Sequence, residues 1–346
     1  MKNIAFVSTE YQQNVLFAIC LQENLTIDIL FLRKNIIIHT NVQEFVDKVV
    51  YYEDVTFSWK SVLNYYREYC KTVSHYIHRE NNYRIFTWSI ENPLVRYAIN
   101  ISRCKDVNLF EDGSGSYIKW GLYNKNLGFK TFLVSSFIFL FTNTVSGSYR
   151  PLKDLWISGW SLYKGCYPDL RIHKRLINHQ YFQQVIKSSL KKEDNYFEIE
   201  NKAKVFINSP YIEFGILSEI EYEIVLKDVV EMIVSSIDTR IDKVFWKIHP
   251  RTNFEKEKKR VQLIADKMDI KITLIPTNES IESFALRNQK KDISYYSLGS
   301  SSLYVIKALV GEKTSVSMVE SDILSRKFRL QKELVDVYRS IGIRII

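Results

Sequence analysis

Residues 106–117 read DVNLFEDGSGSY, and this stretch decides the fold because an apolar run stops at two carboxylates and a glycine. A short apolar run that ends in turn-forming residues is typical of a β-strand. Further runs of this kind lie before it, with helix-length segments between most of them, at residues 3–9, 26–32, 49–53 and 84–89. The alternation predicts βαβ units and a parallel sheet.

The second half of the chain repeats the alternation after a polar, charged stretch that begins near Asn178. Strands are expected at 204–209, 243–250, 270–276, 293–298 and 314–318, with one long closing helix after Glu320. We therefore expect two Rossmann-like α/β domains, residues 1–190 and 200–346, that face a central cleft, with the last helix able to pack back on the first domain. Parallel sheets bind ligands beyond the carboxyl ends of their strands, so functional residues are expected there.

The composition excludes a disordered chain and limits the chemical classes of partner. The chain has 346 residues, 46% of them hydrophobic, and a net charge of +9. This charge favours an anionic partner, and nucleic acid, an acidic membrane surface and a phosphate-bearing small molecule all qualify. Because there is no compact polybasic tract or zinc-finger spacing, nucleic acid is not expected. The four cysteines are far apart, which argues against a metal site or a disulfide framework and fits a reducing cytoplasm.

Two apolar segments bear on the location of the protein. The N-terminal one is five residues long and lacks a cleavage pattern, so it is not a signal peptide. Residues 132–141, FLVSSFIFLF, are about half the length that a membrane span needs. A buried helix is expected there, and an interfacial helix is the alternative. The prediction is a cytoplasmic protein, with peripheral attachment at the inner face of the membrane as an option.

The acidic end of the first stretch suggests a catalytic base. Asp112 follows the strand and precedes Gly113, which lets a substrate approach the backbone, so its carboxylate could accept a proton. Glu111 would point to the opposite side of the strand. The alternative is an acidic turn or a helix N-cap. A dinucleotide fingerprint is excluded because Ile118 stands where a small residue is needed, and no P-loop or D-x-D motif occurs.

In the second half, His249 ends the apolar strand VFWKIHP, where Pro250 turns the chain. The flanking cations Lys247 and Arg251 make this strand end suitable for a phosphate. The alternative is a structural histidine.

A serine-rich segment precedes another expected helix. Gly299 is followed by Ser300, Ser301 and Ser302, so that hydroxyls and backbone N–H groups would point at an anion at the helix N-terminus. Ordinary N-capping is the alternative, but one serine would satisfy it. This segment predicts a phosphate site.

Taken in order, FEDGSGSY (110–117), WKIHPR (246–251) and GSSSL (299–303) resemble the motifs of bacterial sialyltransferases of the lipooligosaccharide sialyltransferase and polysialyltransferase type. The opening VSTEYQQNVLFAI (7–19) is similar to their first strand and helix, and INSPYIEFGILSEIEY (207–222) looks like the start of their second domain. The sequence departs from these relatives at Ser209, where they often carry Gln.

The resemblance implies a GT-B fold and metal-independent, inverting transfer from CMP-sialic acid to a sugar hydroxyl. It assigns the general base to Asp112 and binding of the departing CMP phosphate to His249. Weaker implied roles are a ribose contact for Glu282 and acceptor-side or carboxylate contacts for Thr9 and Gln12. We also expect Glu111 and Gly113 on the acceptor or sialic-acid side. Pro250 would fix its turn, and two of the three serines would contact the phosphate.

Three hypotheses about the function follow, and two of them make the protein an enzyme. The first is an α2,3-sialyltransferase acting on galactose of a lipooligosaccharide, O-antigen or capsule precursor, with a lipid-linked acceptor, no cofactor and a homodimer as an option. The second keeps the fold but uses another nucleotide-sugar donor. The third is a noncatalytic polysaccharide-assembly protein.

Overall fold

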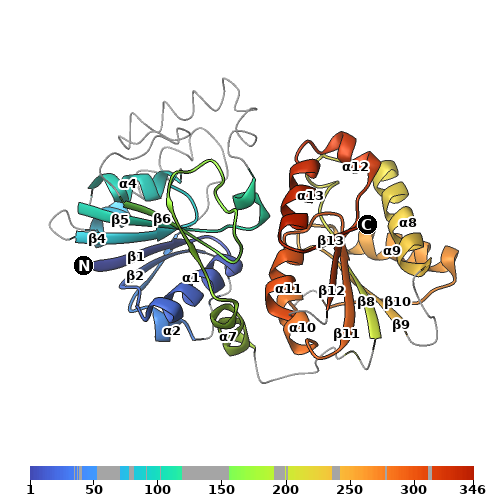
Figure 1. Cartoon of the computed structure of the whole chain (residues 1–346), viewed down its shortest axis with the longest axis horizontal. Coiled ribbons are helices and arrows are strands. Elements are labelled where there is room, and N and C mark those ends of the chain that lie inside the picture. The colour runs from blue at the N-terminus through green and yellow to red at the C-terminus, as the bar shows by residue number, and fades with distance from the viewer. Residues whose placement is uncertain are drawn as a thin grey trace. The chain divides into compact units, whose positions relative to one another are not determined.

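A computed structural model of the chain divides into two compact units, residues 1–189 and 190–346. Each unit is an α/β layer structure built on one parallel sheet (Figure 1). The structure describes residues 1–34, 36, 38, 41–52, 71–77, 82–90, 92–101, 103–118, 156–190, 199, 202–235, 242–276, 279–310 and 314–346.

Unit 1 contains a seven-stranded sheet in the order β3-β2-β1-β4-β5-β6-β7, and every neighbouring pair is parallel. Its strands are β1 (Lys2–Val7), β2 (Ile29–Arg33), β3 (Val49–Tyr52), β4 (Asn82–Thr87), β5 (Arg103–Phe110), β6 (Trp156–Ser161) and β7 (His173–Leu176). Its helices are α1 (Glu10–Glu23), α2 (Val42–Phe45), α4 (Pro93–Ile101) and α7 (His179–Ser189), with a 3-10 turn η1 (Ser114–Tyr117).

Helices cover both faces of this sheet, α4 on one side and α1, α2 and α7 on the other (Figure 1). Since side chains alternate along a strand, Val107 and Leu109 of β5 pack in the core with Leu94 and Val95 of α4. The polar side chain of Asn108 lies on the opposite face of the strand.

Unit 2 contains a six-stranded parallel sheet in the order β10-β9-β8-β11-β12-β13. Its strands are β8 (Lys202–Ile207), β9 (Asp242–Lys247), β10 (Ile272–Leu274), β11 (Asp292–Ser297), β12 (Ser315–Met318) and β13 (Arg344–Ile345). Its helices are α8 (Glu219–Ser235), α9 (Phe254–Met268), α10 (Ile281–Arg287), α11 (Ser302–Val310), α12 (Asp322–Lys327) and α13 (Gln331–Ser340).

The strand order reverses beside the first strand of each unit, between β1 and β4 and between β8 and β11. At such a switch point the chain leaves neighbouring strands in opposite directions, which opens a crevice at their carboxyl ends. Both units therefore offer a ligand site at the same kind of edge.

Several expectations need correction. The closing helix is broken into α12 and α13, because Phe328 adopts an extended backbone and its ring packs edge-on to Tyr211, with centroids 6.3 Å apart. Strands β6, β7 and β13 were not expected. The segment 132–141 lies outside the described residues. So does most of the segment 58–80, where the apolar spacing predicts a long helix, and its residues 71–76 are helical.

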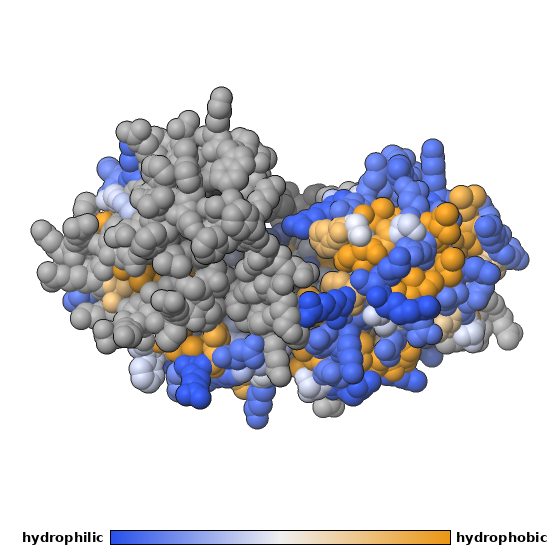
Figure 2. Space-filling model, turned by 90° about the horizontal axis from the view of Figure 1, so that it is seen from above, coloured by the Kyte–Doolittle hydropathy of each residue, from blue (hydrophilic) through white to orange (hydrophobic). Residues whose placement is uncertain are grey.

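The surface of unit 2 combines apolar and charged residues, and hydrophobic side chains show between hydrophilic ones in Figure 2. Ile220 and Ile224 are exposed one helical turn apart on α8. None of the helices in the described ranges has both the length and the hydrophobicity that crossing a bilayer demands.

Candidate active site

The carboxyl edge of unit 1 is organised by the start of α1. Thr9 caps this helix, since its Oγ1 accepts a 3.2 Å hydrogen bond from the Gln12 backbone N–H. The Gln12 side chain is 1% exposed and bridges two strand ends. Its Oε1 accepts from the Ser8 N–H at 2.6 Å, and its Nε2 donates to Oδ1 of Asp112 at 2.5 Å. Gln12 is thus positioned as a support for Asp112, and the acceptor contact expected of it does not fit this burial.

Asp112 stands immediately beyond β5 and is exposed. Its backbone N–H donates to Ser116 Oγ at 2.8 Å, which fixes the turn into η1. Gly113 has φ 102° and ψ −171°, a conformation open almost only to glycine, so the sharp departure of the chain here depends on it. Asp112 keeps contact with solvent, but desolvation by the surrounding protein raises the pKa of its carboxyl to about 6. The hydrogen bond from Gln12 acts in the opposite direction and lowers this pKa.

Glu111 has a different role from the one expected. Its side chain is fully buried, and its carboxylate accepts hydrogen bonds from the hydroxyls of Tyr11 and Tyr117 and from the Leu162 N–H. Burial raises its pKa to about 7, and these three hydrogen bonds oppose the rise. A fully buried carboxylate cannot meet an acceptor, so the acceptor-side role expected of Glu111 does not fit its position. Glu111 ties β5, α1 and the segment after β6 together.

In unit 2, His249 follows β9 and is half-buried. Its Nδ1 accepts a 3.1 Å hydrogen bond from the Arg251 backbone N–H, so the neutral ring carries its proton on Nε2. Burial and the neighbouring Arg251 guanidinium lower its pKa, with Glu213 opposing. Exposed Pro250 and Arg251 complete this turn, which Thr252 closes by donating from its N–H to the His249 carbonyl at 2.9 Å. The histidine is a neutral hydrogen-bond donor at a strand end.

The expected phosphate contact of Lys247 is contradicted by its position. Lys247 is 6% exposed, and its Nζ donates to the carbonyl oxygens of Pro276 at 2.6 Å and Glu279 at 2.5 Å. It therefore anchors the connection between β10 and α10. Glu282, expected near the ribose, lies half-buried in the first turn of α10.

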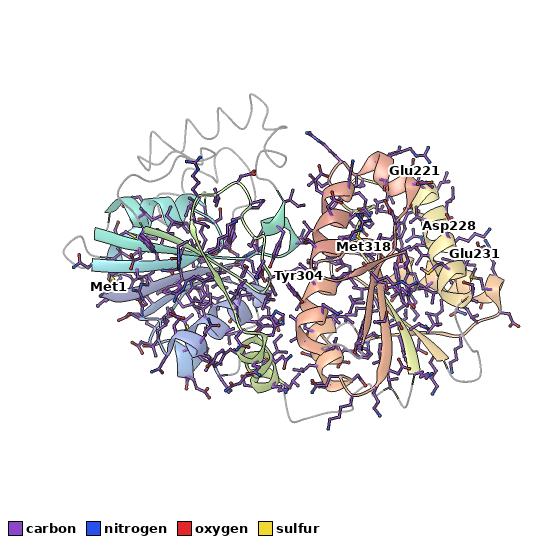
Figure 3. The ribbon with its side chains drawn as sticks, viewed as in Figure 1. Met1, Glu221, Asp228, Glu231, Tyr304 and Met318 are labelled. Carbon is purple, nitrogen blue, oxygen red and sulfur yellow. The ribbon has the colours of Figure 1, made fainter. Side chains whose placement is uncertain are left out.

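Ser297 holds the serine-rich segment after β11, a role that the sequence motif did not predict. Ser297 Oγ donates to the Ile207 carbonyl at 2.8 Å across the switch point, and it accepts from the N–H groups of Ser300 at 3.1 Å and Gly299 at 3.5 Å. Gly299 has φ 140°, and a Cβ there would lie 3.1 Å from the Tyr211 hydroxyl. It would also lie 3.7 Å from Met318, which Figure 3 labels in unit 2. These backbone N–H groups are not free for an anion, contrary to expectation.

The three serines differ in their surroundings. Ser300 Oγ accepts from the Ser302 N–H at 3.3 Å, and the Ser300 carbonyl accepts from the Tyr338 hydroxyl at 2.9 Å. Ser301 is exposed and Ser302 is half-buried at the first position of α11. Ser300 therefore shapes the segment, while the hydroxyls of Ser301 and Ser302 are the ones available at the helix N-terminus.

His249 and these serines share one edge. Their strands, β9 and β11, flank β8, so the two groups are separated by two strand spacings, about 10 Å. Ser209, at the end of β8 between them, is buried. Within the described ranges, no three His, Cys, Asp or Glu side chains gather as a metal site would require.

A family model described as alpha-2,8-polysialyltransferase (POLYST) matches residues 3–319. The chain belongs to this family. Membership makes it a glycosyltransferase and confirms the resemblance read from the ordered motifs. No curated protein matches the chain in sequence.

Two solved structures align with this polysialyltransferase-family chain over nearly its whole length. A UDP-GlcNAc 2-epimerase from Methanocaldococcus jannaschii shares 13% identity with a TM-score of 0.53, covering 100% of this chain and 89% of the other. An alpha/beta-galactoside alpha-2,3-sialyltransferase from the luminous marine bacterium Photobacterium phosphoreum shares 12% identity with a TM-score of 0.47, covering 99% and 98%. The α/β fold with two parallel sheets, the GT-B type expected from the sequence, is confirmed.

Proposed function

We propose that the chain transfers sialic acid from CMP-sialic acid to a sugar hydroxyl, with inversion and without a metal. The observation that carries the proposal is the Asp112 carboxylate, held at the end of β5 by Gln12, exposed to solvent, with a pKa of about 6. A general base works best when its pKa lies near the working pH. The family membership supplies the sialyltransferase chemistry that such a base would serve.

In the proposed step, Asp112 takes the proton of the acceptor hydroxyl as the oxygen bonds to the anomeric carbon of sialic acid. The bond from that carbon to the phosphate oxygen breaks, and its electron pair leaves with CMP. The transition state resembles an oxocarbenium ion, so the barrier depends on proton removal and on stabilising the departing phosphate.

Unit 2 would supply that second function. The Nε2–H of His249 and the hydroxyls of Ser301 and Ser302 are hydrogen-bond donors at one sheet edge, and the start of α11 adds a favourable dipole for negative charge. A monophosphate leaving group carries less charge than a diphosphate, so these donors could replace a metal. Glu282 keeps the role of a proposed ribose contact, and Arg251 that of an exposed cation for the donor.

Two acceptors are proposed. The resemblance read from the sequence favours galactose in α2,3 linkage, on a lipid-linked lipooligosaccharide, O-antigen or capsule precursor. The family description favours a second candidate, addition to a terminal sialic acid in α2,8 linkage. The net charge of +9 supports association with an anionic surface, and exposed Ile220 and Ile224 support peripheral membrane contact. A homodimer stays a prediction.

The test is a transfer assay with CMP-sialic acid and EDTA. A fluorescent lactoside and its sialylated derivative serve as acceptors, and mass and linkage of the products are measured. We expect a product with one acceptor, loss of transfer by about 100-fold or more in Asp112→Asn, and no change in Asp228→Asn, an exposed aspartate of α8 labelled in Figure 3. Absence of both transfer and CMP release would overturn the proposal, and activity only with another nucleotide sugar would change the donor.

A further inference from the structure

Unit 1 contains a cavity that the proposed reaction does not use. It has a volume of about 380 Å³, within the range of small-molecule sites, and lies beside the C-terminal end of α1 on the sheet face opposite α4. Strands β4 to β7 form its floor. Asn108, Trp156 and Trp160 are among its lining residues.

The cavity is separate from the carboxyl edge. Asn108 precedes Asp112 by four residues, which on an extended strand is about 13 Å. Asp106 and Trp156 lie further toward the amino ends of β5 and β6, where they are register partners. A ligand in the cavity would not occupy the site of proton transfer.

The charges that line the cavity cancel. Arg84 Nε lies 3.2 Å from Asp106 Oδ2, and Arg175 Nη2 lies 3.1 Å from Glu23 Oε2. Each cation has a carboxylate partner, so the cavity carries no net charge and is not built for an anion. It is nevertheless rich in planar hydrogen-bonding groups, which suits a neutral ligand with many hydroxyls.

Two tryptophans line the cavity beside these polar groups, and only Trp156 offers an exposed apolar surface. Trp160 is 1% exposed, and the Arg175 guanidinium lies 4.2 Å from its ring centroid. Trp156 is 62% exposed, although exposed tryptophans are uncommon, and its Nε1 donates to Ser158 Oγ at 3.2 Å. The His173 ring lies beside this indole, with centroids 6.0 Å apart, and most of the indole surface remains exposed.

A buried amide completes the cavity. Asn108 is 6% exposed, and its Oδ1 accepts a 3.1 Å hydrogen bond from Trp160 Nε1. This bond uses the oxygen and fixes the orientation of the amide. Among the residues that the structure describes, the two amide N–H groups of Asn108 have no acceptor, so they can donate to a ligand.

We propose that this cavity binds a neutral pyranose sugar. One face of a pyranose ring presents C–H groups, which match the exposed Trp156 ring, and its hydroxyls match Asn108 and the two arginine–carboxylate pairs. Its distance from Asp112 makes it a holding site for a sugar that is not reacting. The sugar class follows from the lining residues alone, so it does not depend on the proposed transfer reaction.

The test is binding without donor, by isothermal titration calorimetry and saturation-transfer NMR on the full chain. Methyl galactoside, methyl glucoside, free sialic acid and cytidine are the ligands. We expect a neutral glycoside to bind in the millimolar range and sialic acid and cytidine not to enter the cavity. Trp156→Ala should weaken binding about tenfold, equivalent to about 1.4 kcal/mol, and Trp156→Tyr should retain most of it.

Two controls locate the binding. Tyr51→Ala removes another exposed aromatic residue of unit 1 outside the cavity and should change nothing. Asp112→Asn should abolish transfer yet keep glycoside binding, which separates this proposal from the transfer reaction. The proposal is overturned if no neutral glycoside binds, if Trp156→Ala binds like the wild type, or if Asp112→Asn removes the binding.

Discussion

The side-chain amide of Gln12, in the first turn of α1, donates a 2.5 Å hydrogen bond to Oδ1 of Asp112, a hundred residues further along the chain. Because Gln12 is also bound to the Ser8 N–H, the carboxylate is oriented by the end of β1 as well as by its own strand. A base oriented in this way keeps Oδ2 for the substrate. The predictions below follow from this bond and from the groups around it.

The rate should depend on the protonation of Asp112. Only the carboxylate can accept a proton, and its pKa is raised to about 6. We therefore expect log kcat/KM to rise with unit slope as the pH increases toward about 6 and to level above it. A pH–rate profile, measured with a non-sialylated and a sialylated acceptor, records this rise, which is the acidic limb of the profile. A profile that is flat between pH 4 and 7 would rule out Asp112 as the base.

Gln12→Ala should impair positioning more than binding. We expect kcat to fall about tenfold with a small change in KM, since the carboxylate loses its orienting donor. The hydrogen bond from Gln12 lowers the pKa of Asp112, so its loss should move the acidic limb to higher pH. Gln43→Ala, an exposed glutamine of α2, is the control. An unchanged limb in Gln12→Ala would mean that Gln12 has only a structural role.

Glu111→Gln should change how stability depends on pH. The pKa of Glu111 is raised from 4.5 to about 7, so the folded state holds its proton more tightly than the unfolded state. Its favourable contribution is complete below the unfolded pKa and is lost as the pH rises through about 7. In the wild type, Glu111 should lower the free energy of unfolding by up to about 3 kcal/mol as the pH rises through this window. The Glu111→Gln variant should not show this fall.

Urea denaturation between pH 4.5 and 8 measures that difference. Glu44→Gln, an exposed glutamate of α2, should show the same pH dependence as the wild type. Equal slopes for Glu111→Gln and the wild type would contradict the buried, proton-binding role.

Lys247→Met should act on stability. The ammonium group is buried and bonded to two carbonyl oxygens, so its loss leaves those acceptors without partners and should cost about 2 kcal/mol. Thermal unfolding measures this loss, with Lys258→Met on the exposed face of α9 as the control. A variant with normal stability but much weaker CMP binding would restore the phosphate contact expected from the sequence.

Much of the fold could be predicted because buried parallel strands are apolar runs. KVFINS and KVFWKI became β8 and β9, with polar residues at their ends. Strand β7, HKRL, was missed because it is a polar edge strand, and β6 because WISGWS includes a glycine and serines. Both strands are recognisable from their pairing with neighbouring strands, because their own sequences contain too short an apolar run to predict a strand.

The candidate site was predictable in its location and less so in its individual roles. Adjacent carboxylates look equal in a sequence, yet the pleat buries Glu111 and exposes Asp112. Lys247 and His249 are two residues apart, and here too only one remains at the edge. Ser297, Tyr11 and Tyr117 were missed because their roles arise from tertiary contacts that no local motif encodes.

The segment after β11 owes its shape to distant residues of α13. The Tyr338 hydroxyl donates to the carbonyls of Gly299 and Ser300, and Gln331 Nε2 donates to that of Leu298 at 3.0 Å. During translation, the serine hydroxyls would acquire their final arrangement only after this helix has left the ribosome. A nascent or prematurely terminated polypeptide would thus contain Asp112, the proposed base, before its serine hydroxyls could bind a nucleotide.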